Sequence, residues 1–262
     1  MRLRSRCSPS WPGTPSRSTT GAGFADYAER RYGTTDPRAV SAWGALRRGP
    51  YDMLSGEWSE PQDSLYAARP SLTVRTAAAW SPTSMRYDLV NTARQVLANR
   101  SRTLLPEIKA AYDAADLPRF RALAAEWKGD MDLLERLLAS DPRFLVGPWL
   151  RDVKAWGTTD SEKRTLEYDA RSIMTTWGHR ASSDGGPLHD YANRELSGLV
   201  ADFYAMRWTR YLDTLDTALA TGTPPAPIDW FAIEDAWNRE TKTYPVAATG
   251  DPYRLAIEVA AR

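Results

Sequence analysis

The sequence contains little of what most metal and redox sites require. Its 262 residues include one cysteine, Cys7, and two histidines, His179 and His189. A single cysteine cannot form an internal disulfide, and the histidines show no HExxH or other paired spacing. We therefore expect no metal site and no cofactor.

Long apolar stretches are missing too. No run approaches the ~20 apolar residues of a membrane helix, and the arginines at positions 2, 4 and 6 are not followed by the apolar core of a signal peptide. The formal net charge is only +1, which would attract neither nucleic acid nor an anionic membrane. We expect neither partner.

What the sequence does contain is tryptophan, with 11 residues of this type. Most should lie in a core, and a chain of this length can bury one good core. Indole rings also stack on sugar rings, so the excess favours a carbohydrate partner.

The spacing of apolar residues predicts an all-α fold, a multi-helix array packed ridge into groove. The clearest helix follows Asp116, a predicted N-cap, with Pro118 in its first turn and Pro142 beyond its end. Its apolar stripe consists of Phe120, Leu123, Ala124, Trp127, Met131, Leu134 and Leu138.

Other stripes predict further helices. One helix carries Tyr87, Val90, Ala93 and Leu97, and another begins at Asp160 or Ser161 and carries Leu166, Ala170, Ile173, Met174 and Trp177. A third should begin near Asp190, run through Leu199, Phe203 and Met206 to Leu215, and end at Gly222. Short helices are predicted over 24–33, 36–48, 230–237 and 253–259.

Residues 1–23 differ from the rest because they contain no Asp, Glu or Lys and are dominated by Arg, Ser, Pro, Thr and Gly. This composition predicts a disordered tail. The alternative is that this segment is translated out of frame. With permitted codon choices, a shifted reading frame encodes a stretch that includes FALFAELAW and looks like a helix of a folded protein. Either way, we expect the folded, all-α domain to span residues 24–262.

From residue 24 onward the chain resembles the C-terminal all-helical domain of the α-N-acetylglucosaminidases, glycoside hydrolase family 89. The resemblance is carried by the segments FADYAERRYG, ARPSL, RYDLVNTARQVLANR, LLASDPRFLVGPWL, TTWG, LHDYANRELSGLVADFY and MRW. None of these is a catalytic signature alone, but their order and spacing together are specific.

The resemblance implies a catalytic (β/α)8 barrel upstream of residue 24. Two glutamates on that barrel would carry out retaining hydrolysis of terminal α-linked N-acetylglucosamine, with their carboxyl groups ~5 Å apart. The chain alone should therefore hold no catalytic residue and be inactive. The expected partners are an N-acetylglucosamine-terminated glycan and the barrel of the same enzyme, in a secreted or extracellular setting.

The resemblance also implies three substrate-binding residues. Trp177 would face the sugar, Leu188 would line the pocket, and Tyr191 would offer its ring and hydroxyl. From the residues alone, Trp177 could instead end in the core, and Tyr191 could pack at a helix start. Asp190 reads as an N-cap and Glu195 as a surface carboxylate.

Several other features have structural interpretations. Arg207 and Trp208 match a family RW pair and are predicted to pack together through a cation–π contact. Residues 161–171, SEKRTLEYDAR, read as a solvated helix face with i,i+4 pairs. The family places a pocket histidine before ARPSL, but this sequence has no histidine there. The loop GHRASSDGG departs from the shorter family segment.

The sequence is also compatible with two alternatives. The helical domain could be a stand-alone carbohydrate-binding or protein-docking module, or a purely structural array without sugar contact. A domain made to pack on a barrel should expose a large apolar patch, whereas a stand-alone module should be polar there.

Overall fold

The computed structural model describes residues 65–72, 85–186 and 188–262, together with residues 26, 27, 29, 30, 33, 37 and 40. The chain divides into two compact units, Met1–Asp52 and Met53–Arg262. In the first unit, residues 26, 27, 29, 30, 37 and 40 are helical, in agreement with the helices predicted over 24–33 and 36–48. Residues 1–23, including Cys7, lie outside the described residues.

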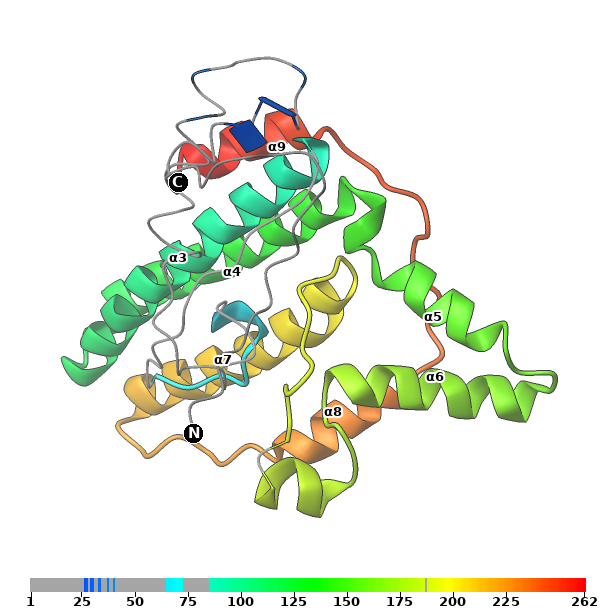
Figure 1. Ribbon diagram of the computed structural model, residues 1–262. Coiled ribbons are helices and arrows are strands. Elements are labelled where there is room, and N and C mark those ends of the chain that lie inside the picture. Colours follow the sequence, from blue (N-terminus) through cyan, green and yellow to red (C-terminus); the bar gives the residue numbers. More distant parts are fainter. Residues whose placement is uncertain are drawn as a thin grey trace, which may run out of the picture. The chain divides into compact units, whose positions relative to one another are not determined.

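The second unit is built on a pair of long helices, α3 (Met85–Asp113) and α4 (Leu117–Ala139). They lie side by side, with α9 (Pro252–Ala260) packed against both (Figure 1). As predicted, Asp116 caps α4: its carboxylate accepts a hydrogen bond from the amide of Arg119 at 3.1 Å. All seven residues of the predicted α4 stripe are buried.

Tryptophans form the centre of the core. Trp127 of α4 contacts Trp208 and Tyr66, with ring centroids 4.4 and 4.6 Å apart. Trp208 belongs to α7 (Ala205–Thr221), which continues from the π-helical turn η4 (Val200–Tyr204). Its indole nitrogen donates to the carbonyl of Tyr66 at 3.1 Å, so the buried polar atom is satisfied. As predicted, α7 ends at Gly222, which has a left-handed φ of 68°.

The remaining helices of the second unit are α5 (Val146–Lys154), α6 (Asp160–Met174) and α8 (Trp230–Asn238), with the short turns η1 (Leu65–Ala67), η2 (Pro142–Phe144) and η3 (Ala181–Gly185). Helix α6 packs on α5 and on α8 (Figure 1). Extended pairing within the described residues is limited to one parallel bridge, Leu145 to Ser197. The all-α prediction is confirmed.

The helix predicted to begin near Asp190 starts later, at Leu199. Asp190 is not its N-cap, because its own φ is 62° and its side chain is buried against Arg207. The start of this helix is instead capped from α4. The carboxylate of Glu135 accepts hydrogen bonds from the amides of Gly198 and Ala201, at 2.8 and 3.1 Å.

The predicted solvated face of residues 161–171 is also wrong in part. Glu167 and Arg171 form the expected i,i+4 ion pair at 3.0 Å, but both side chains are buried. Arg171 stacks over the ring of Trp237, with its guanidinium carbon 4.5 Å from the ring centroid. Similarly, Glu195 is buried rather than on the surface, because it pairs with Arg94.

The RW pair is structural, as predicted, but its two residues do not stack on each other. The guanidinium of Arg207 lies over the rings of Phe203 and Tyr204, at 4.5 and 5.2 Å from their centroids, while Trp208 packs on Trp127. None of the helices in the described part of the chain is long and apolar enough to cross a membrane.

Candidate functional site

Trp177 and Tyr191 meet at the surface of the second unit. Their rings are arranged edge to face, with centroids 5.0 Å apart, and 38% of Trp177 and 58% of Tyr191 is exposed. The interpretation of Trp177 as a core residue is therefore wrong. Helix α6 ends at Met174, and Trp177 adopts a left-handed φ of 61° that turns it out of the helical stripe. Ile173 of that stripe is exposed as well.

Leu188 lies in the turn that carries Tyr191. It is half-buried, its carbonyl accepts from the amide of Tyr191 at 3.2 Å, and its own amide donates to the carbonyl of Ser182. The structure thus brings the rings of Trp177 and Tyr191 into direct contact, and Leu188 lies in the same turn as Tyr191. The two exposed rings in contact present an apolar aromatic surface.

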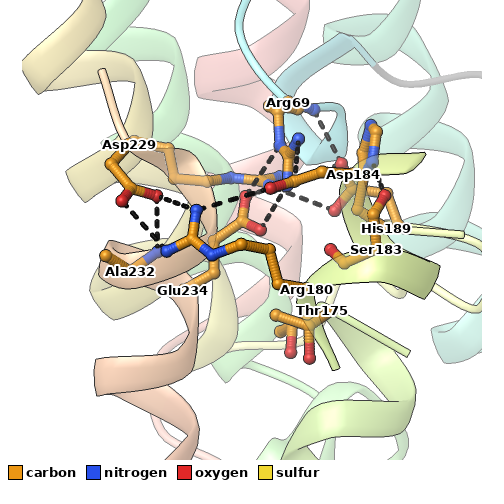
Figure 2. A network of polar contacts seen from close by, with 12 residues as sticks. Arg69, Thr175, Arg180, Ser183, Asp184, His189, Asp229, Ala232 and Glu234 are labelled. Carbon is orange, nitrogen blue, oxygen red and sulfur yellow. Dashed lines mark hydrogen bonds and ion pairs between the residues drawn. The ribbon is translucent and has the colours of Figure 1, made fainter. Parts of the chain in front are cut away.

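A network of charged side chains lies beneath this surface. The buried guanidinium of Arg207 donates to both carboxylate oxygens of Asp190, at 3.0 and 3.1 Å, and to Glu234 of α8 at 2.8 Å. Arg69 reaches the same Glu234 through two bonds, at 3.1 and 2.7 Å (Figure 2). The backbone amide of Arg69 donates to Asp190 at 2.8 Å. Two carboxylates and two guanidinium groups therefore compensate one another.

Burial and neighbouring charges shift the pKa values of these groups in opposite directions. Burial raises the pKa of Asp190 above its ordinary value, although the charge of Arg207 opposes the rise. Burial alone would also raise the pKa of Glu234, but Arg207 and Arg69 hold it below its ordinary value. Desolvation would lower the pKa of Arg207, yet the two carboxylates keep that pKa raised, so Arg207 stays charged.

The outer part of the network is exposed and fastens the loop of residues 178–186. Arg180 makes two hydrogen bonds to Asp229, at 2.7 and 2.9 Å, and its guanidinium lies over the ring of Phe231. Asp229 also caps α8 by accepting from the amide of Ala232 (Figure 2). Asp184 of the loop accepts from Arg69 at 3.2 Å. These contacts tie the loop to the start of α8.

The two histidines have local partners. His189 pairs through Nδ1 with the carbonyl of Ser183 at 2.8 Å, and Nδ1 of the exposed His179 accepts from the amide of Ser182 at 3.4 Å. Within the described residues, no three His, Cys, Asp or Glu side chains gather into a group that could hold a metal ion.

Surface hollows are found away from the aromatic pair. One of about 510 Å³ is lined mainly by Arg136, Arg254 and Glu258, and one of about 360 Å³ is lined mainly by Arg164, Tyr168 and Arg239. Neither includes a predicted site residue. Ligand sites are usually enclosed on several sides, so the exposed rings of Trp177 and Tyr191 would need an opposing surface to surround a ligand.

Further apolar side chains are exposed on α5, on α6 and in the turn between them. Trp156 is 80% exposed, and Trp149 and Ile173 are 45% and 44% exposed. The indole nitrogen of Trp149 donates to the carbonyl of Ala170 on α6, which sets this ring beside the helix that leads to Trp177. A large apolar patch was the property expected of a domain that packs on another.

The sequence interpretation missed Arg69 and Glu234. Arg69 stands in the ARPSL segment, where no local pattern predicts a partner for its guanidinium. Glu234 lies in the apolar segment WFAIEDAW, where an acidic residue on the inner face of a short helix was the available signal. Its side chain is fully buried, which requires the charge partners found in the structure.

Comparison with known proteins gives one consistent result. The family model described as Alpha-N-acetylglucosaminidase (NAGLU) C-terminal domain matches residues 24–86 and 76–262. Human α-N-acetylglucosaminidase is 31% identical in an alignment of 260 residues, and the match covers 89% of this chain and 34% of the human protein. The chain thus spans about a third of the length of this relative.

Solved structures with the same fold come from Clostridium perfringens. One is a family 89 enzyme with two glutamates replaced by glutamine, in complex with its substrate GlcNAc-α-1,4-galactose. It has a TM-score of 0.83 and 27% identity, and the match covers 95% of this chain and 32% of that chain. A second structure, with 2-acetamido-1,2-dideoxynojirimycin, matches with the same TM-score, identity and coverage.

Proposed function

Because the chain belongs to the α-N-acetylglucosaminidase C-terminal domain family, we propose that it is the helical part of a glycoside hydrolase. The reaction is the removal of terminal α-linked N-acetylglucosamine from glycans. The support is the family match, the human relative, and a structural relative that holds GlcNAc-α-1,4-galactose.

In this proposal Trp177, Leu188 and Tyr191 form one wall of the sugar pocket. The observation that carries it is the exposed aromatic pair, since two large rings held together at a surface offer a platform for a sugar ring. The hydroxyl of Tyr191 would hydrogen bond to a polar group of the sugar. The opposing wall would come from the barrel of the same enzyme.

The chemistry belongs to the barrel in this proposal. Two carboxyl groups ~5 Å apart would act as nucleophile and as acid/base in a retaining mechanism. The helical wall would hold the sugar ring in place and keep water away from its face, which helps by fixing the reacting geometry. The chain alone should then bind sugar weakly and hydrolyse nothing.

The exposed side chains Trp149, Trp156 and Ile173 support barrel docking, because apolar surface of this kind is stabilised when another surface covers it. The resemblance further favours a secreted or extracellular enzyme.

The test is a hydrolysis assay on a joined protein, in which residue 24 of this chain follows the barrel of a family 89 relative. The joined protein should release N-acetylglucosamine from an α-linked nitrophenyl substrate, whereas this chain alone should not. A joined protein that folds but does not hydrolyse the substrate would count against the proposal. Sequencing the DNA upstream of codon 24 adds an independent check, because an open frame encoding a barrel with two suitably placed glutamates is expected there.

A further inference from the structure

Two of the three non-glycine residues with positive φ in the described part of the chain lie at the candidate sugar wall. Trp177 has a φ of 61°, and Asp190, which directly precedes Tyr191, has a φ of 62°. Left-handed backbone is unfavourable for residues with a Cβ atom, and it persists only where surrounding contacts hold it. The contacts that hold these two residues therefore determine where both rings point.

The two strained positions are joined through the backbone of Asp190. Its amide donates to the carbonyl of Thr175 at 2.7 Å, and Thr175 is two residues before Trp177. The amide of Trp177 donates to Ser172 at the end of α6, also at 2.7 Å. The side-chain hydroxyl of Thr175 is fixed as well, by Asn238 of α8 at 2.6 Å.

The side chain of Asp190 makes further contacts that hold this residue in place. Its carboxylate accepts from Arg207, which is fully buried, and from the backbone amide of Arg69. Arg207 and Arg69 are both held by Glu234, whose side chain is fully buried. Asp190 thus has ionic contacts below the surface and a backbone contact to the turn that carries Trp177.

We propose that Asp190 is a positioning residue, which sets Trp177 and Tyr191 relative to each other through its bonds to Thr175, Arg207 and Arg69. The inference rests on the proposed function for its sugar ligand, but the positioning itself can be measured without sugar. A neutral amide at this position would keep the shape of the side chain and weaken the pairing with Arg207. The turn would then lose the contact that opposes its backbone strain.

The test uses fluorine NMR on the full chain labelled with fluorotryptophan. The Trp177 signal is assigned by its loss in Trp177→Phe. Asp190→Asn should shift or broaden this signal in the sugar-free protein, and Glu234→Gln should do the same more weakly while keeping the Asp190 carboxylate. Glu167→Gln is the matched control, because it alters another buried carboxylate paired with an arginine, Arg171.

An unchanged Trp177 signal in both Asp190→Asn and Glu234→Gln would overturn the inference. So would an equal change in Glu167→Gln, because the effect would then reflect general loosening of the fold. Thermal unfolding shows whether each variant folds. If Asp190→Asn does not fold, the Trp177 signal of Glu234→Gln alone confirms or overturns the inference.

Titration with N-acetylglucosamine separates this inference from the proposed function. Sugar should shift the Trp177 signal of the unaltered chain, with an affinity on the order of tenfold weaker in Asp190→Asn and unchanged in Glu167→Gln. If sugar leaves the Trp177 signal unchanged in the unaltered protein, the proposed sugar wall fails. The comparison of sugar-free variants would still confirm or overturn the positioning role.

Discussion

The rings of Trp177 and Tyr191 meet edge to face with their centroids 5.0 Å apart, and both residues are exposed at the surface. The two residues stand before and after the segment 178–190, which follows the end of α6. Their contact turns two separate exposed rings into one apolar platform, and the charged network below keeps that platform in place.

Replacing either ring by alanine should impair catalysis in the joined protein. We expect Trp177→Ala and Tyr191→Ala each to lower kcat/KM by about ten- to hundredfold, because the pocket would lose apolar contact with the sugar. Steady-state kinetics on an α-linked nitrophenyl substrate measures the change. Tyr253→Ala, which removes an exposed aromatic ring on α9 away from the proposed docking residues, is the control and should leave kcat/KM unchanged. Equal losses in all three variants would contradict a specific role for the pair.

Trp208 should contribute strongly to stability. It is 1% exposed, packs on Trp127 and donates to the carbonyl of Tyr66, so Trp208→Ala would leave a cavity and an unpaired carbonyl. We expect the free energy of unfolding to fall by about 3 to 5 kcal/mol. Urea denaturation followed by circular dichroism measures the fall. The exposed Trp156 offers the comparison, since Trp156→Ala should change stability by less than about 0.5 kcal/mol.

The start of α4 offers a smaller and more local test. The carboxylate of Asp116 accepts from the amide of Arg119 at 3.1 Å. Asp116→Ala should lower the free energy of unfolding by about 1 kcal/mol, and Asp116→Asn should recover most of the loss because Asn is also a good N-cap. If alanine and asparagine were equivalent in denaturation experiments, the hydrogen bond would not be the source of the effect.

Glu162 should make stability depend on pH. Its carboxylate accepts hydrogen bonds from the hydroxyl and the amide of Thr158, both at 2.7 Å, and from the amide of Thr159 at 3.0 Å. These bonds lower the pKa of Glu162 from 4.5 to about 2. The folded state therefore holds this proton less readily than the unfolded state, so the contribution is complete above pH 4.5 and is lost as the pH falls through about 2.

A melting series in acid checks this sign. Glu162→Gln keeps an acceptor oxygen but cannot ionise. The difference in Tm between the unaltered protein and Glu162→Gln should be constant above pH 4.5 and shrink toward pH 2. A difference that stays constant through this range would show that ionisation of Glu162 is not what stabilises the start of α6.

Local patterns in the sequence predicted the parts of the fold that depend on neighbours along the chain. The apolar stripe of α4, the cap at Asp116 and the end of α7 at Gly222 are all confirmed, because helix periodicity, caps and left-handed glycines are properties of a few consecutive residues. The long continuation of α3 through Pro106 and the short helix α5 were not predicted.

The mistakes concern polar residues whose partners are distant in sequence. Asp190 and Glu195 looked like a cap and a surface group, but Arg207 and Arg94 bury them as ion pairs. The start of the α7 segment could not be located from its own residues, since Glu135 on α4 caps it. The periodicity of a sequence does not predict contacts between polar residues that are distant along the chain.

Only part of the candidate site could be predicted from the sequence. Composition suggested a sugar partner through its tryptophans, and the family resemblance selected Trp177, Leu188 and Tyr191. The exposure of Trp177 depends on the backbone turn after Met174, where a φ of 61° breaks the helical stripe. A periodicity argument assumes that the helix continues, so it placed this ring in the core.

The most direct test of the sugar wall is a crystal structure of the joined protein with N-acetylglucosamine bound. We predict that the sugar lies within about 4 Å of the rings of both Trp177 and Tyr191, between them and the barrel. A structure in which the sugar occupies the barrel while these two rings remain turned toward solvent would contradict the account.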